Sequence, residues 1–237
     1  MTPTAPDVSG PLAVLGLLAN SELMAFSRLA ADAAVAPALR DRLELCRLGG
    51  VAAHRLERLG ARVAELGGAL PDVVAPFLGS YVDFDARTPA GSWCERLLKA
   101  YVGYGVEDDV ARLLATGLDP TTRALVVDVL ADDGHANLVV DRLTAAIGQD
   151  ATLGSRLALW GRRLVGEALG VVQRVVTEHG ELRALLEEAL LEEALLEDAL
   201  LKDALPRADG AGALRQRLFA VLTGEHTRRM ERLGLTA

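Results

Sequence analysis

Hydrophobic residues recur at helical spacing along most of this chain and predict long amphipathic helices joined by short turns. The first expected helix follows Pro11 and ends near Pro37, and its apolar stripe is interrupted once, at Glu22. The second expected helix covers residues 38–66 and ends at a Gly-Gly pair. A looser stretch follows over residues 69–91, with a short helix near residues 73–82.

Two capping patterns predict where the next helices begin. Ser92 and Glu95 have the spacing of a capping box, so we expect a helix over residues 92–117. Asp119-Pro120 predicts an N-cap and a first-turn proline for a helix that reaches about residue 147. Further helices are expected from about residue 153 and over residues 211–233. Long helices joined by short turns favour an all-α antiparallel bundle.

The composition agrees with a single helical domain spanning residues 1–237. Hydrophobic residues make up 51% of the chain but aromatic residues only 4%, so leucine, alanine and valine must fill the core. Cys46 and Cys94 are too few and too isolated for a disulfide framework or a thiolate metal site. The first ten residues lack a basic region, and the apolar run at residues 12–19 is too short to span a bilayer. We therefore expect a cytoplasmic protein that does not enter the membrane.

An acidic repeat interrupts the chain at about residues 181–205. It reads LLEEA, LLEEA, LLEDA and LLKDA over residues 185–204, and Pro206 ends it. The segment contributes about −6 of the net charge of −8, so the remaining chain is nearly neutral. A five-residue period makes the leucine pairs spiral around a helix, which argues against a coiled-coil seam. The repeat is interpreted either as a tolerated protruding helix or as a contact with a partner or a second copy.

Several polar residues lie on faces that are otherwise apolar. Glu22 lies on the stripe of the first helix, where a carboxylate is costly unless it is hydrogen-bonded, ion-paired or metal-bound. Asp109 lies within an apolar face of the 92–117 helix, whereas Glu107 lies off that face. Asp132 and His135 are three positions apart, a spacing that lets both reach one ion.

The second helix supplies a weaker candidate. His54 lies off the main leucine face of its helix, and its neighbour three positions earlier is Val51, which cannot bind a metal. A pair of iron or manganese ions in a helical bundle needs one acid from each of two helices and an acid-x-x-His pair from each of two others. The predicted metal ligands are therefore Glu22, His54, Asp109, Asp132 and His135. Each of them also has a structural explanation, as a buried acid, a solvated helix edge or a surface histidine.

Three blocks of the sequence resemble an actinobacterial ferritin-like family. They are residues 21–30 (SELMAFSRLA), 130–136 (LADDGHA) and 157–169 (LALWGRRLVGEAL). The family is similar to the tRNA hydroxylase that acts on 2-methylthio-N6-isopentenyl-type adenosine. The resemblance covers roughly residues 10–180 and the last helix. It implies a ferritin-like antiparallel bundle with additional C-terminal helices.

The resemblance also implies a non-haem di-iron centre that uses dioxygen to hydroxylate a modified base of tRNA. Glu22, His54, Asp132 and His135 match ligand positions, and two iron ions are the implied cofactor. The match breaks at Val51, where an acid-x-x-His pair would have a glutamate. Alignment to the hydroxylase favours Glu107 as the remaining ligand, whereas the helical face favours Asp109, and both alternatives stay open.

Three hypotheses for function follow. The first is a di-iron oxygenase, the second is a non-catalytic ferritin-like scaffold that has lost part of the metal site, and the third and weakest is iron storage. Two groups of arginines are candidates for contact with tRNA, although solvated helix faces explain them equally well. These groups are Arg215, Arg217, Arg228, Arg229 and Arg232 near the C-terminus and Arg40, Arg42 and Arg47 on the second helix.

Overall fold

The computed structural model describes residues 9–131, 134–201 and 211–237, and every regular element in these ranges is helical. The first half contains α1 (Gly10–Val35), α2 (Leu39–Glu65), α3 (Leu70–Val74), η1 (Ala75–Phe77), α4 (Val82–Arg87) and α5 (Trp93–Leu98). The second half contains η2 (Lys99–Gly103), α6 (Gly105–Ala115), α7 (Pro120–Leu130), α8 (Gly134–Ile147), α9 (Ala151–Glu178), α10 (Gly180–Leu201) and α11 (Ala211–Arg232). The prediction of an all-α fold is confirmed.

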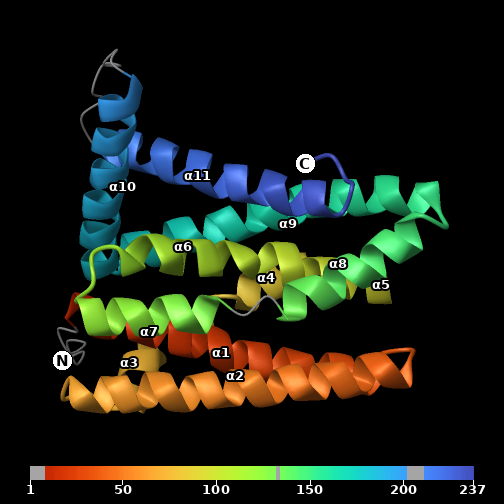
Figure 1. The fold of residues 1–237 in the computed structure, drawn as a ribbon, viewed down its shortest axis with the longest axis horizontal. Helices are drawn as coiled ribbons and strands as arrows, with labels where there is room; N and C mark the ends of the chain where they lie inside the picture. Colours follow the sequence, from red (N-terminus) through yellow and green to blue (C-terminus); the bar gives the residue numbers. More distant parts are fainter. Residues whose placement is uncertain (1–8, 132–133, 202–210) are drawn as a thin grey trace.

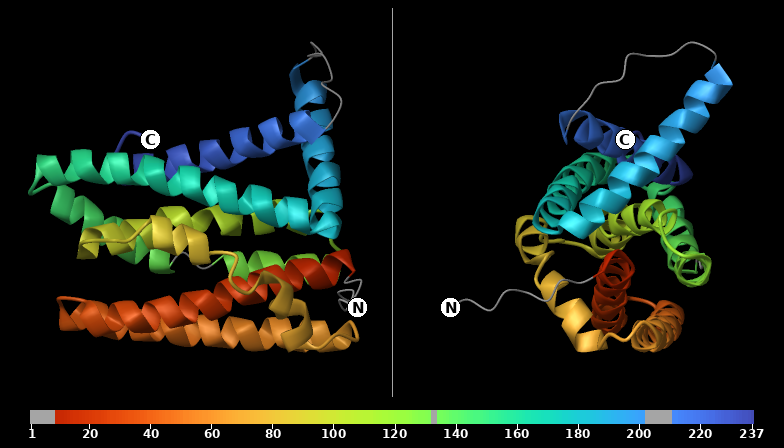
Figure 2. Two further views of the ribbon diagram at one scale, coloured as in Figure 1. Left: turned by 180° about the vertical axis from the view of Figure 1, so that it is seen from behind. Right: turned by 90° about the vertical axis from the view of Figure 1, so that its left-hand side faces the viewer.

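The long helices are stacked in layers (Figures 1 and 2). Helices α1 and α2 run antiparallel as one layer, α6, α7 and α8 lie above them, and α9 and α11 form the far layer. Helix α10 crosses the end of these helices steeply instead of running alongside them. It contacts α1, α6 and α9 there, so it ties the layers together at one end.

Helix α1 is the apolar centre of the bundle. Its first half, from Ala13 to Asn20, is buried without a break, and this segment packs on α2, α3, α6 and α10. The helix is also long and apolar enough to cross a membrane by length and composition, and 56% of its most apolar window is buried inside the protein. Such burial is what a core helix of a water-exposed bundle also shows, so α1 alone is weak support for a membrane span.

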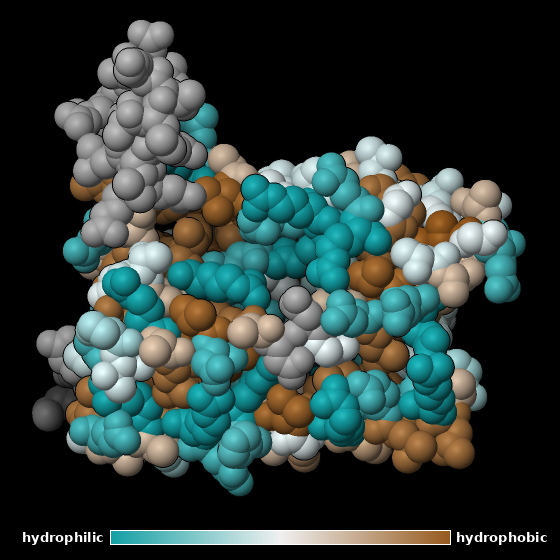
Figure 3. Space-filling model, viewed as in Figure 1, coloured by the Kyte–Doolittle hydropathy of each residue, from teal (hydrophilic) through white to brown (hydrophobic). Residues whose placement is uncertain are grey.

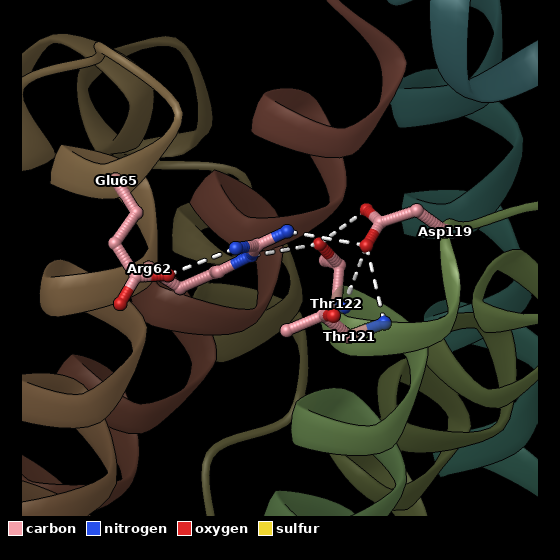
Figure 4. A network of polar contacts seen from close by, with 5 residues as sticks. All are labelled: Arg62, Glu65, Asp119, Thr121 and Thr122. Carbon is pink, nitrogen blue, oxygen red and sulfur yellow. Dashed lines mark hydrogen bonds and ion pairs between the residues drawn. The ribbon is translucent and has the colours of Figure 1, made fainter.

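Both predicted N-caps are present, although the Glu95 carboxylate accepts from the Gly91 amide and not from Ser92 as a full capping box would have it. Ser92 Oγ accepts a hydrogen bond from the Glu95 amide at 3.3 Å, and the Asp119 carboxylate accepts from the Thr121 and Thr122 amides at the start of α7. Figure 4 shows that Arg62 of α2 extends this second cap, since its Nε donates to Thr122 Oγ1 and its Nη2 lies 3.1 Å from Asp119 Oδ1. The cap therefore also joins α2 to α7.

Two of the expected helices are divided. The helix predicted over residues 92–117 consists of α5, one π-helical turn over Lys99–Gly103, and α6. The helix predicted from Pro120 to about residue 147 ends at Leu130, and α8 begins at Gly134. Asp132 and Asp133 lie between these two helices and outside the described residues.

The acidic repeat begins inside the core. Leu182, Leu186 and Leu190 are buried along one face of α10, four residues apart, and Leu185 packs beside α1 and Gly117. The leucine pairs therefore do supply an apolar face over this part of the helix, which the five-residue period did not predict. The α10 backbone continues to Leu201, but the side chains from residue 192 onward in this helix are outside the described part of the structure.

Candidate functional site

A polar pocket of about 410 Å³ lies between α1, α2, α6, α8 and α11. Among the residues that line it, six are arginines and five are acids, so charges of both signs face one another inside the bundle. On the face drawn in Figure 3, hydrophilic side chains gather along α11 and over the helices beneath it. A pocket this size is typical of small-ligand sites.

Glu22 lies in this pocket, as its position on an apolar stripe predicted. The side chain is buried, and its Oε1 lies 3.4 Å from Arg55 Nη1 of α2. Burial raises the pKa of Glu22 to about 7, although the positive charge of Arg55 lowers it. Its nearest cation is therefore a side chain of the neighbouring helix.

Helix α2 contributes no metal ligand to the pocket. The α2 residues that line it are Leu48, Val51, Ala52 and Arg55. His54 points away, because its side chain is 71% exposed and its Nδ1 lies 3.6 Å from Glu57 on the outer face. The structure therefore does not bring His54 to the other predicted ligands. The sequence already indicated this orientation, because His54 lies off the leucine face of its helix.

Both acids that the sequence left as alternatives on α6 are buried in the pocket. The apolar face was drawn as if residues 92–117 formed one regular helix, but the π-helical turn inserts an extra residue and rotates everything after it. Burial raises the pKa of Glu107 to about 7, although the nearby hydroxyls of Ser21 and Tyr81 lower it. Asp109 is equally buried, and burial raises its pKa to about 6.

Asp109 is held by two arginines. Arg229 Nη2 of α11 lies 2.5 Å from Asp109 Oδ1 and also donates to the Gly105 carbonyl at 2.7 Å. Arg112 Nη1, one turn later on α6, lies 3.2 Å from the same carboxylate oxygen. The carboxylate that the helical face favoured as a metal ligand is thus the anchor that attaches α11 to α6.

His135 also lines the pocket, near the start of α8. It is half-buried, and burial together with the charge of Arg28 lowers its pKa to about 3, so the imidazole is neutral. A neutral imidazole is the form that binds metals. Asp132, its predicted partner, lies outside the described residues. Asp128, in the last turn of α7, is exposed and pairs with Arg58 of α2 at 2.7 Å.

The pocket residues that the sequence analysis did not single out are three arginines. Arg28, Arg55 and Arg112 come from three different helices, and all three line the pocket. The sequence could have placed Arg55 in the pocket, because Arg55 lies four residues after Val51 and hence on the same face of α2. Arg229 had been assigned to a surface group, yet its side chain is largely buried.

The fold and the pocket define the class of this protein. An all-α bundle with a polar pocket between its antiparallel helices is the architecture expected of a ferritin-like domain. The chain belongs to the family of actinomycete ferritin-like domains, whose family model matches residues 9–189. The match ends within α10, so α11 and the pocket arginines that it carries lie beyond it. No curated protein matches the chain.

The described donors do not fit a pair of iron ions. A bundle di-metal site takes ligands from four helices, two of which supply an acid-x-x-His pair. Here α2 supplies none, and Glu22 of α1 and Asp109 of α6 each already contact an arginine. Within residues 9–131, 134–201 and 211–237, no three His, Cys, Asp or Glu side chains are grouped so that they could hold a metal ion.

Proposed function

We propose that this ferritin-like domain is a metal-independent binding module rather than a di-iron oxygenase. In this proposal the cationic charge at the centre of the bundle comes from arginine side chains, which hold the buried carboxylates in place. The pocket is then free to take a small molecule. The second hypothesis from the sequence, a scaffold that has lost part of the metal site, is closest to this account.

The observation that carries the proposal is Arg55. Its guanidinium reaches Glu22 from the helix that would have to supply an acid-x-x-His pair, and Val51 and Ala52 occupy the same face. A guanidinium cannot lose its proton in a protein and has no acceptor, so it cannot bind a metal. An iron ion beside Glu22 would therefore meet a fixed positive charge at close range.

The di-iron hydroxylase remains the second candidate. It is favoured by one observation, namely that Glu22, Asp109 and His135 line the same pocket as their order along the chain predicted. In that case Asp132 would join His135, iron would supply dioxygen chemistry, and the arginines of α11 would contact tRNA. The absence of a ligand on α2 counts against a second iron ion.

Anaerobic addition of ferrous iron followed by exposure to air separates the two candidates. A di-iron site would develop the near-ultraviolet absorption of an oxo-bridged pair and would consume dioxygen in proportion to protein. The binding-module proposal expects neither signal above that of iron in buffer. An oxo-bridge band that disappears in Glu22→Gln, a variant with nearly the same shape, would overturn it.

We also propose that the outer part of α10 contacts a partner or a second copy of the chain. Leu191 is exposed directly beside the buried Leu190 on this helix. Light scattering of Leu191→Glu tests this contact, with Leu159→Glu as a control at an equally exposed leucine of α9. A molar mass that is the same for both variants and the parent protein would contradict a contact between two copies.

A further inference from the structure

Four guanidinium groups converge on the pocket from four different helices. Arg28 belongs to α1, Arg55 to α2, Arg112 to α6 and Arg229 to α11. The carboxylate of Asp108 lies within electrostatic range of all four of them. Yet within the described residues Asp108 makes no hydrogen bond and no ion pair, so it sits among the arginines without binding any one of them directly.

The arginines are not all neutralised by close contacts. Arg112 and Arg229 share a single carboxylate oxygen, Oδ1 of Asp109. Arg28 is stacked over the Tyr104 ring at 3.9 Å and forms no ion pair with a carboxylate in the described ranges. Arg112 and Arg229 share one carboxylate, and among the described residues Arg28 pairs only with an aromatic ring. These three side chains therefore carry positive charge that a further anion could balance.

The rim of the pocket adds to this positive charge. Arg228 and Arg232 of α11 lie on it. Arg228 is paired with Glu225, whereas Arg232 Nη2 donates to the uncharged Asn137 Oδ1 at 3.2 Å. An exposed arginine beside a concave site raises the local concentration of anions and speeds their entry. The approach to the four inner arginines is thus favourable for a negatively charged molecule.

Part of the pocket lining is apolar. Leu29 of α1 and Leu48, Val51 and Ala52 of α2 form it, and they offer no hydrogen-bonding side chain. A small inorganic ion would fill only part of a space of about 410 Å³. The combination of an arginine-rich side and an apolar side suits a molecule with a charged head and an apolar body.

We propose that this pocket binds a phosphate ester whose organic part is apolar. The phosphate group would lie between Arg28, Arg112 and Arg229, with its body against the apolar wall of α2. Phosphate is favoured over a carboxylate because it is tetrahedral and carries up to two charges, so it accepts hydrogen bonds from donors that approach from different helices. This inference rests on the proposed metal-independent function and assigns the class of ligand to the same pocket.

Isothermal titration calorimetry with three probes tests the assignment. Phenyl phosphate carries both the head and the body, inorganic phosphate only the head, and phenol only the body. We expect phenyl phosphate to bind about tenfold or more tightly than inorganic phosphate and phenol to give no measurable heat. Equal affinity for phenol and phenyl phosphate, or no binding of any probe at millimolar concentration, would overturn the proposal.

Substitutions then locate the site. Asp108→Asn removes a negative charge without changing the shape, so phenyl phosphate should bind roughly tenfold more tightly. Arg112→Met should weaken it about tenfold, whereas Arg174→Met, which removes an arginine paired with Asp83 elsewhere on the surface, should leave it unchanged. An Asp108→Asn protein that melts normally and binds phenyl phosphate no better than the parent would also overturn the assignment.

These results are separable from a failure of the proposed function. Stoichiometric iron in the purified protein would contradict metal independence, whatever binds in the pocket. Absence of iron together with absence of phosphate-ester binding would leave metal independence standing and remove only the ligand assignment.

Discussion

Nη1 of Arg55 lies 3.4 Å from Oε1 of Glu22, so that a guanidinium of α2 faces the buried carboxylate of α1 inside the pocket. Both side chains are largely shielded from water, which strengthens their attraction and makes either one costly to leave alone. In a metal-binding bundle this carboxylate would face an ion. Here the chain itself supplies the opposing charge, and the stability of the bundle should depend on it.

Arg55→Met should destabilise the protein by roughly 1–3 kcal/mol, because it leaves the buried Glu22 carboxylate without its cation. The pKa of Glu22 is already raised to about 7, and removing Arg55 should raise it further. A carboxyl with a raised pKa favours the folded state while it is protonated and disfavours it when it is ionised. The decrease in the free energy of unfolding caused by Arg55→Met, measured by chemical denaturation, should therefore be larger at about pH 8 than at about pH 6.

Arg58→Met is the matched control for this experiment. Arg58 lies one turn further along α2 and pairs with Asp128 on the outer surface. Exposed ion pairs contribute about 0–1 kcal/mol, so this variant should remain close to the parent at both pH values. Equal losses in the two variants would show that the Arg55–Glu22 pair has no special role.

The double substitution Val51→Glu with Arg55→His should create metal binding. Both positions line the pocket one helical turn apart, so a carboxylate and an imidazole there would face Glu22 from α2. We expect visible absorption from bound cobalt(II) in the double variant and none in the parent protein. Identical cobalt spectra for the two proteins would mean that α2 does not decide metal binding.

Gly16→Ala should strongly destabilise the fold. A Cβ atom at this position of α1 would lie 2.1 Å from the Val73 carbonyl oxygen, and backbone cannot move aside cheaply. Gly170→Ala is the control, because a Cβ in that part of α9 meets nothing within 4 Å and alanine favours a helix by roughly 0.5–1 kcal/mol. Thermal melts should thus shift in opposite directions, and a Gly16→Ala protein as stable as the parent would contradict the packing of α3 on α1.

His226 should make the protein sensitive to acid. It is buried in α11, its ring nitrogens find no partner among the described residues, and burial followed by the charge of Arg229 lowers its pKa to about 4. A histidine with a lowered pKa stabilises the folded state above about pH 6.5, and this contribution is lost as the pH falls toward 4. The full loss would be on the order of 3 kcal/mol.

His226→Leu removes the titrating group but keeps an apolar side chain of similar size at this position. Its free energy of unfolding should decline less than that of the parent between about pH 6.5 and pH 4.5. Parallel declines for both proteins over this range would show that His226 does not titrate as its burial implies.

Much of the bundle was predictable because local rules govern it. Helical spacing and the caps at Ser92 and Asp119 identified the long helices, and the apolar stripe around Glu22 identified an inward-facing acid. The π-helical turn at Lys99–Gly103 was not predictable from periodicity. It changes the phase of α6 and buries Glu107 as well as Asp109.

The contents of the pocket were harder to predict, because they depend on which helices become neighbours. Arg229 and Asp109 are 120 residues apart in the sequence, and no local pattern predicts that they form a pair. The spacing of metal ligands indicates His54, but that side chain points outward, and the adjacent Arg55 faces the pocket in its place. Arg55 lies four residues after Val51, so the helical period alone places it on the pocket face of α2.

The metal content of the purified protein tests the central claim most directly. The chain should be expressed with ample iron, purified in air without chelators, and measured by inductively coupled plasma mass spectrometry alongside the Val51→Glu, Arg55→His double variant. We predict that the parent protein carries iron and manganese far below one ion per chain and that the variant carries more. A parent protein with close to two iron ions per chain would contradict the account.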